Sequence, residues 1–226
     1  MRALHSILFL LALSLLIPLP GCAAAPVSAP APVGLEVPIL MYHSVLKDPA
    51  KNGKYVVSPD ELEQDLLYLS QQGYTTVFLS ELVDFVEGRG ALPAKPVVIT
   101  FDDGYLNFIT YALPILEEHD MKAVLSVVGE YTRIFSETPD PNPNYAHCTF
   151  EDIRMLSLSG LVEIQNHSDN LHSLNRRRGS SRMAGESAAD YRAIFIADAE
   201  KLQAELTEKS GVIPICYTYP LSLIHI

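Results

Sequence analysis

Short apolar runs alternate with longer amphipathic stretches from about residue 58 to residue 219. The runs are rich in β-branched residues and bounded by Pro, Gly or polar residues, a pattern typical of buried strands. The stretches between them place apolar residues at helical spacing, as Leu62, Leu66 and Leu69 do. The pattern predicts strands at residues 75–78, 96–101, 122–128, 161–166 and 213–219.

Sequence motifs typical of helix starts and ends occur between these predicted strands. A capping box, Ser58-Pro59-Asp60-Glu61, has Pro at the first helical position, and Gly73 ends the helix that it starts. Ser80 and Thr149 are expected to cap two further helices. Longer helices are predicted over residues 105–119 and 187–209, and a long loop over the Pro-containing residues 129–147.

The alternation of strands and helices favours an α/β fold. Repeated units of this kind imply a parallel sheet or barrel, and periodicity alone does not separate a barrel from a doubly wound sheet. The length of 226 residues allows one domain plus appendages. The net charge of −11 argues against nucleic acid or an anionic lipid surface as the main partner.

Two adjacent carboxylates follow the predicted strand at 96–101. The sequence Thr100-Phe101-Asp102-Asp103-Gly104-Tyr105 leads from that strand into a helix, the place where α/β enzymes present catalytic groups. Neighbouring residues on a strand point to opposite sides, so Asp102 and Asp103 are expected to do different jobs. A helix N-cap with a spare charge is the plainer alternative.

A second polar turn, which carries His167 and His172, follows the predicted strand at 161–166. An Asp and two His supply three ligands with open positions, the arrangement that a catalytic Zn²⁺ needs. Solvated or hydrogen-bonded loop histidines are the alternative for this pair. Taken together, the acidic turn and the histidine pair favour a metal site.

Thr100-Phe101-Asp102-Asp103-Gly104, followed by His167-Ser168 and His172, resembles the polysaccharide deacetylase (NodB-homology) family of carbohydrate esterases. The resemblance runs from about Val37 to Pro220. Four residues separate the two histidines, as in the poly-N-acetylglucosamine deacetylase branch, where the commonest family motif has three. Val37–His43 is similar to the first strand of that branch. The resemblance implies a distorted (β/α)₇ barrel.

The resemblance also implies roles for individual residues. Asp103, His167 and His172 would hold one divalent metal ion, and Asp102 would be the general base. Imidazole and carboxylate ligands suit Zn²⁺ first, with Co²⁺, Ni²⁺ or Fe²⁺ as alternatives. His43 would approach the site from the first strand, or would be a core histidine with one hydrogen bond.

The third family motif starts at Tyr217-Thr218-Tyr219-Pro220, which places Tyr219 and Pro220 near the oxyanion. The family continues with an aromatic residue and a Gly, but this chain continues with residues 221–226, which leave no room for the later motif that supplies the leaving-group acid. We therefore expect an incomplete, inactive deacetylase domain over residues 36–220, that is, a C-terminally truncated barrel. Residues 221–226 are expected to be a non-native tail, because their coding DNA would resemble a sequencing adapter.

The first residues form a targeting segment, residues 1–22, whose apolar core from Ile7 to Ile17 is too short to span a bilayer. Leu19-Pro20-Gly21-Cys22 resembles a bacterial lipobox, and acylation of Cys22 would anchor the mature protein to a membrane. Cleavage by ordinary signal peptidase would instead release a secreted protein. The Ala- and Pro-rich residues 23–35 predict an extended tether.

These inferences favour an exported, lipid-anchored hydrolase of the bacterial cell surface that removes N-acetyl groups from an N-acetylglucosamine-containing polysaccharide. Its partners would be the glycan substrate and the membrane, the latter through the lipid anchor only, and not nucleic acid. Two alternatives are a catalytically inactive glycan-binding lipoprotein of the same fold and a metal amidohydrolase of a small amide. The complete set of an Asp and two His favours the enzyme.

Overall fold

The computed structural model describes residues 34–221. Contacts divide the chain into two units, Met1–Leu35 and Glu36–Ile226, and the second contains every named helix and strand. The predicted targeting segment, Cys22, most of the tether and residues 222–226 lie outside the described residues. Among residues 34–221, no helix has the length and apolarity needed to cross a bilayer.

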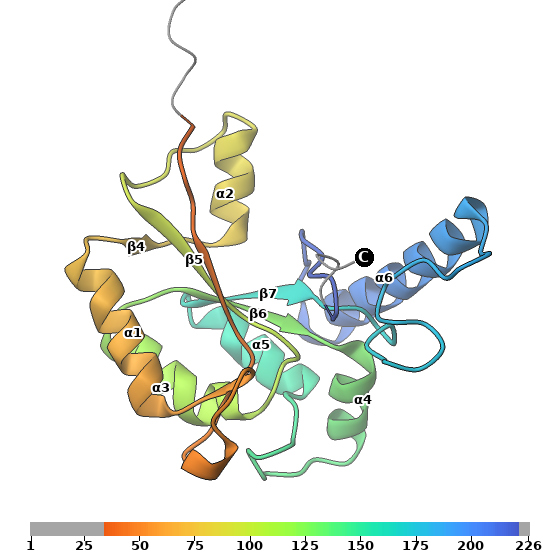
Figure 1. Cartoon of the computed structure of the whole chain (residues 1–226), viewed down its shortest axis with the longest axis horizontal. Coiled ribbons are helices and arrows are strands. Elements are labelled where there is room, and N and C mark those ends of the chain that lie inside the picture. Colours follow the sequence, from red (N-terminus) through yellow and green to blue (C-terminus); the bar gives the residue numbers. More distant parts are fainter. Residues whose placement is uncertain (1–33, 222–226) are drawn as a thin grey trace, which may run out of the picture. The chain divides into compact units, whose positions relative to one another are not determined.

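A parallel sheet forms the centre of the second unit (Figure 1). Its strand order is β1, β5, β6 and β7, and the short strand β4 pairs with the start of β5. The predicted parallel α/β arrangement is therefore confirmed. The strands are β1 (Ile39–Tyr42), β4 (Thr75–Thr76), β5 (Pro96–Phe101), β6 (Ala123–Val127) and β7 (Val162–Asn166), and β2 (Ser44–Val45) pairs separately with β3 (Val56–Val57).

Every second residue along the strands points to the same side of the sheet and contributes to one apolar face. Val97, Ile99 and Phe101 of β5 are fully buried on this face and belong to the main core. Leucines of two helices pack in the same core, so this face holds the helices to the sheet. These leucines are Leu62, Leu66 and Leu69 of α1 (Pro59–Gln71) and Leu202 and Leu206 of α6 (Ala188–Ser210).

Helices follow most strands, and Figure 1 shows α1, α3 and α5 below the labelled strands and α2 above them. A π-helical turn, Phe108–Ala112, leads into α3 and replaces the first part of the single helix predicted over 105–119. The remaining helices are α2 (Leu79–Val86), α3 (Leu113–Glu118), α4 (Gly129–Glu137) and α5 (Phe150–Leu158), with a 3₁₀ turn at Pro49–Lys51.

Two helix starts predicted from local capping motifs are confirmed. Ser58 accepts a hydrogen bond from the backbone N–H of Glu61 at 3.2 Å, and the Glu61 carboxylate accepts one from the Ser58 N–H at 2.7 Å. Thr149 and Asp152 form the same reciprocal pair at the start of α5. Each motif satisfies backbone donors that a helix start leaves without intrahelical partners.

The predicted cap at Ser80 is wrong, because α2 begins at Leu79 and Phe78 occupies the cap position. The backbone N–H groups of Leu79 and Ser80 donate to the carboxylate of Glu163 on β7, at 3.2 and 3.1 Å. A carboxylate that is distant in the sequence therefore caps this helix.

The long loop predicted over 129–147 is also partly wrong, because α4 occupies Gly129–Glu137. Its cap position is Val128, which makes no side-chain capping bond. Instead, the first N–H groups donate to backbone carbonyls of the histidine turn, from Gly129 to Ser168 at 3.0 Å and from Glu130 to Asp169 at 2.8 Å. A cap of this kind leaves no motif in the local sequence.

The strand predicted at 213–219 is reduced to one isolated parallel bridge between Tyr217 and Asn166. The side-chain oxygen of Gln165 accepts from the backbone N–H groups of Ile215 and Cys216, at 2.9 and 2.8 Å. The Gln165 side chain thus replaces part of the backbone hydrogen bonding that a paired strand would make, and it holds this segment beside β7.

Candidate metal centre

The carboxyl ends of three parallel strands bring the predicted site residues to one edge of the sheet. His43 follows β1, Asp102 follows β5 and His167 follows β7. Parallel strands end at the same edge, and in open α/β sheets ligands bind at that edge. The convergence of these residues is therefore a direct consequence of the strand order.

Asp103 lies between the two histidines of the second turn. Its Oδ1 atom is 2.9 Å from Nε2 of His172 and 3.4 Å from Nε2 of His167. One ligand atom from each of the three residues lies within 4.8 Å of the other two. Asp103 and His167 are buried, whereas His172 is partly exposed, so the cluster is open on the His172 side.

The backbone of the acidic turn is left-handed at two successive residues. Asp103 has φ 73° and Gly104 has φ 71°. A Cβ at residue 104 would lie 2.9 Å from Cγ1 of Val127, so the turn needs glycine for space as well as for conformation. Left-handed backbone is uncommon for a residue such as Asp103 and concentrates at functional sites.

The orientation of His167 is fixed by a residue far along the chain. Its Nδ1 atom lies 2.9 Å from the backbone oxygen of Thr218, and a carbonyl oxygen can only accept, so Nδ1 carries the proton. The other ring nitrogen, Nε2, then faces Asp103 and is the atom available to a metal ion. This is the tautomer that a metal-ligating histidine needs, with its second nitrogen held by a backbone carbonyl.

The electrostatics of the cluster favour a charged carboxylate. Burial alone would raise the pKa of Asp103, but His167 and His172 outweigh burial and hold that pKa well below its ordinary value of 3.8. Burial works to lower the pKa of His172, but the Asp103 carboxylate raises it above the ordinary value of 6.5. Asp103 is thus ionised and ready to bind a cation.

Asp102 has a different environment from its neighbour. Its side chain is buried, and within residues 34–221 its Oδ1 atom has no hydrogen-bond partner. Burial raises the pKa of Asp102 above 3.8, although His167 and His43 oppose this effect. A carboxylate with a raised pKa is a stronger proton acceptor.

The residues of the cluster suit a divalent cation. Oδ1 of Asp103 is buried and makes no well-aligned hydrogen bond among the described residues, although both imidazoles approach it. A buried anionic oxygen without such a bond is costly unless a cation neutralises it. One carboxylate and two imidazoles form the ligand set of catalytic zinc sites that keep an open position.

The histidine turn is tied to two helices by an ion-pair network. The Asp169 carboxylate contacts the guanidinium of Arg133 on α4, and its Oδ2 is 2.7 Å from Nζ of Lys201 on α6. Arg133 also donates to Glu205 at 2.6 Å. In addition, the Asp169 N–H donates to Asp198 at 2.8 Å. The turn that presents His167 and His172 is therefore held on both sides.

His147 is a site residue that the sequence did not reveal. It is buried, and its Nδ1 lies 2.9 Å from the backbone oxygen of Asp103. Its ring packs against Tyr105 and Tyr131, with ring centroids 4.5 and 4.6 Å away. The residue stands in the segment predicted as loop, where no periodicity or motif singles it out.

The other predicted residues make contacts outside the three-residue cluster. The ring of His43 packs against Tyr55 at 4.9 Å. Tyr219 is half exposed and stacks on Phe195 of α6, with centroids 5.9 Å apart. Pro220 is buried, and its carbonyl passes so close to Gly179 that a Cβ there would lie 2.6 Å from it. In the third motif, Thr218 makes the contact with His167.

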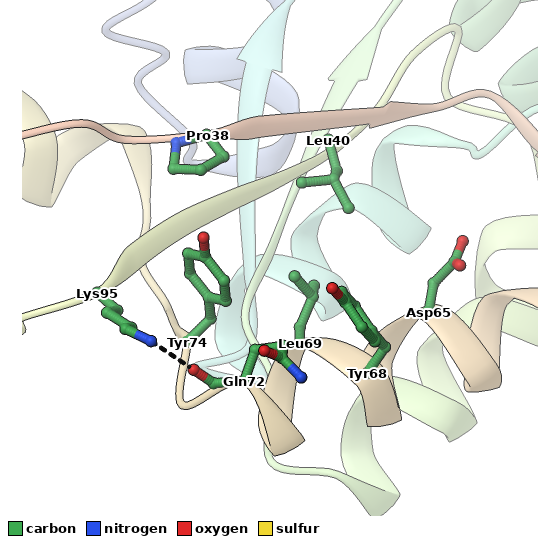
Figure 2. A pocket seen from close by; sticks show the side chains of 8 residues that line it. All are labelled: Pro38, Leu40, Asp65, Tyr68, Leu69, Gln72, Tyr74 and Lys95. Carbon is green, nitrogen blue, oxygen red and sulfur yellow. Dashed lines mark hydrogen bonds between the residues drawn. The ribbon is translucent and has the colours of Figure 1, made fainter.

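Two pockets lie away from the cluster. One, of about 330 Å³, lies between β1 and α1, where Lys95 donates to the backbone oxygen of Gln72 beside Tyr74 (Figure 2). The other, of about 760 Å³, follows the first half of α6 and has Tyr219 in its lining. Neither pocket is lined by the Asp103, His167 and His172 cluster.

A parallel α/β sheet with an acidic turn and a histidine pair at its carboxyl edge is the arrangement expected from the resemblance to the polysaccharide deacetylase family. The family model described as polysaccharide deacetylase matches residues 89–224, which is more than half of the chain. The chain belongs to the polysaccharide deacetylase family, and the resemblance inferred from its motifs is confirmed.

The chain is also similar in sequence to individual named enzymes. The chain is 28% identical to the poly-beta-1,6-N-acetyl-D-glucosamine N-deacetylase of Escherichia coli K12 over 204 aligned residues. This alignment covers 80% of this chain and 30% of the relative. The chain is 25% identical to the enzyme of the same name from Staphylococcus aureus N315, with 74% and 54% coverage. The chain thus spans about a third to a half of the length of these relatives.

Solved structures confirm the fold. A de-N-acetylase from Aggregatibacter actinomycetemcomitans aligns with a TM-score of 0.67 at 28% identity, over 79% of this chain and 76% of its own. IcaB from Ammonifex degensii aligns with a TM-score of 0.66 at 27% identity, over 83% and 75%. The α/β fold of the polysaccharide deacetylase type is therefore shown.

Proposed function

We propose that the protein is a metal-dependent N-deacetylase of a β-1,6-linked N-acetylglucosamine polysaccharide. One observation carries the proposal: a polysaccharide deacetylase chain brings Asp103, His167 and His172 together near the buried Asp102, whose Oδ1 has no partner among the described residues. The substrate is inferred from the names of the Escherichia coli and Staphylococcus aureus relatives.

Amide hydrolysis needs a stabilised oxyanion, an activated water and a proton for the leaving amine. A divalent ion held by Asp103, His167 and His172 would supply Lewis acidity toward the amide carbonyl and the attacking water; Zn²⁺ suits these ligands, as do Co²⁺, Ni²⁺ and Fe²⁺. Asp102 would accept the proton of the attacking water at Oδ1, which has no hydrogen-bond partner within residues 34–221. Its raised pKa favours that transfer. The proton for the leaving amine would come from the acid of the later family motif.

The surrounding residues keep these groups in place. The carbonyl of Thr218 holds the ring of His167, and Gly104 lets the acidic turn approach Val127 closely. Burial of Asp102 excludes bulk water from its carboxylate, which strengthens its interaction with a reacting water. The chain therefore supplies a preorganised proton acceptor and a rigid set of ligands.

We also propose that the protein acts at the cell surface. The lipobox-like residues Leu19–Cys22 and the uncharged segment that follows support an acylated Cys22 on a short tether. A surface location would give the active site access to an exported glycan.

Acetate release from β-1,6-linked N-acetylglucosamine oligomers, measured on the protein completed with the later family motifs, tests the proposed activity. Release should stop when a chelator removes the metal and return when Zn²⁺ is added. Asp102→Asn should keep metal binding and lose about 10²–10⁴-fold in turnover, because an amide cannot accept the proton.

Three outcomes would count against the proposal. Undiminished hydrolysis after chelation would exclude the metal role, and near-normal turnover by Asp102→Asn would make that residue structural. Glycan binding without acetate release from the completed, zinc-loaded protein would favour a binding function.

A further inference from the structure

His147 contacts the acidic turn at its backbone. The Nδ1 atom is 2.9 Å from the carbonyl oxygen of Asp103, and the ring is too far along the chain to be part of either family motif. Because a carbonyl oxygen only accepts hydrogen bonds, Nδ1 must be the protonated nitrogen. His147 therefore donates to the residue that aims a carboxylate at His167 and His172.

The packing around His147 fixes the direction of this donor. The ring lies between Tyr105 and Tyr131, with centroids 4.5 and 4.6 Å away, and Phe135 is 5.6 Å away. The backbone is fixed too, since Tyr105 and His147 form an antiparallel bridge and the Cys148 N–H donates to Gly104 at 2.8 Å. A ring held on these sides cannot turn its N–H toward another acceptor.

The acceptor belongs to a residue with left-handed backbone. Asp103 has φ 73°, a conformation that is uncommon for residues other than Gly, Asn and Asp and that concentrates at functional sites. Relaxation to negative φ would rotate the carbonyl of Asp103 together with its side chain. Oδ1 would then leave its place at 2.9 Å from His172 and 3.4 Å from His167.

We propose that His147 is a positioning residue of the metal centre, whose N–H bond to the Asp103 carbonyl holds the left-handed turn and thereby sets metal affinity. Within residues 34–221 the converging ligand atoms come from Asp103, His167 and His172, and not from His147. The inference rests on the proposed metal site.

Three substitutions separate the hydrogen bond from the packing. In His147→Asn the side-chain N–H occupies the position of Nδ1, so the donor is kept. In His147→Gln the amide reaches the position of Nε2 and this donor is lost, although size and polarity are similar. His147→Phe keeps the ring between the two tyrosines and removes the donor. His119→Gln, at the end of α3, is a matched control away from the cluster.

Zinc affinity, measured by competition with a chromophoric chelator, is the main readout, and the melting temperature of the metal-free protein is the second. His147→Gln and His147→Phe should each weaken Zn²⁺ binding about 10–100-fold, the usual effect of losing an outer-shell partner. His147→Asn should remain within about threefold of the wild type because it keeps the donor. His119→Gln should bind as the wild type does.

Two results would overturn the inference. Wild-type affinity in His147→Gln or His147→Phe would show that the hydrogen bond does not matter, and equal losses in the Asn and Gln variants would show that packing alone acts. Wild-type protein that binds no Zn²⁺ would refute the proposed metal site itself, and this inference with it. If His147→Phe fails to fold, the Asn and Gln pair still decides the question.

Discussion

Asp102 and Asp103 are adjacent in the chain, yet their carboxylates have different surroundings. Oδ1 of Asp103 lies within 3.4 Å of both imidazoles, whereas Oδ1 of Asp102 has no partner among residues 34–221. The histidines lower the pKa of Asp103, and burial raises the pKa of Asp102. Two identical side chains thereby acquire the opposite acidities that a ligand and a proton acceptor need.

The pKa shift of His172 predicts how the stability of the metal-free protein depends on pH. The folded-state pKa of His172 is raised above 6.5 by Asp103, so its stabilising contribution is complete below pH 6.5 and is lost as the pH rises through the raised pKa. Asp103, whose folded-state pKa is lowered, contributes fully above its ordinary value of 3.8 and does not change in this window. The His172–Asp103 pair should therefore weaken from pH 6 to pH 9.

The measurement is the difference in melting temperature between the wild type and His172→Gln across this pH range, with chelator present. A difference is needed because burial lowers the pKa of His147, which makes its contribution change in the opposite direction. The wild type should be more stable than the variant at pH 6, and its advantage should shrink by pH 9. A difference that stays constant across the range would contradict the predicted pairing.

At the scale of elements, the histidine turn is held by α4 and α6 as well as by the strand that precedes it. Its backbone carbonyls cap α4, and Asp169 pairs with Arg133 on α4 and Lys201 on α6. The Asp169 carboxylate is almost fully buried, with 4% of its side chain exposed. Helix packing on both sides of the turn therefore also fixes the direction of the ligands.

Arg133→Met tests this connection, because it removes the guanidinium and keeps most of the apolar stem. The free energy of unfolding should fall by about 1.5–3 kcal/mol, the range for hydrogen bonds to charged groups, since Lys201 still faces Asp169. Arg154→Met is the matched control, because Arg154 and Glu151 form an exposed surface pair and should contribute less than about 1 kcal/mol. Urea unfolding of the metal-free proteins gives both values, and equal losses would contradict the proposed role of Arg133.

How well each helix start can be predicted depends on how far along the sequence its stabilising partner lies. The start of α1 is readable because Ser58 and Glu61 satisfy each other within one turn. At the start of α2, Glu81 accepts from the Phe78 N–H at 2.8 Å, but the next two N–H groups donate to the distant Glu163. The start of α4 depends on backbone carbonyls of the histidine turn. No local pattern carries such contacts, so a predicted cap was misplaced in α2 and a predicted loop proved to contain a helix.

The same distinction holds in the candidate metal centre. Asp103, His167 and His172 could be named from the sequence because each follows a strand whose direction sets where its carboxyl end lies. His147 and Thr218 could not, because their contacts depend on how a loop and a late segment fold back onto the acidic and histidine turns. Sequence therefore predicts which side chains converge at this edge of the sheet, but not the residues that orient them.

At the scale of the whole molecule, the tethering segment predicts where the protein is found. Cys22→Ser should move the protein expressed in a bacterium from the membrane fraction to the soluble fraction, because acylation of Cys22 is the proposed anchor. The wild type should also incorporate a labelled fatty acid. Cys216→Ser is the control, since this half-buried cysteine lies in the folded domain and its loss should leave the distribution unchanged. A wild-type protein found in the soluble fraction without label would contradict the anchor.

The bond between His167 and the carbonyl of Thr218 has a consequence for the order of folding. The two residues are 51 positions apart, and a chain synthesised from its amino terminus releases His167 well before Thr218. Until the late segment docks, the imidazole can turn freely or adopt the other tautomer. Contacts of such sequence separation form slowly, because the loop between them must first close. Metal uptake should therefore mark the end of folding, and an early ion would meet only part of its final ligand geometry.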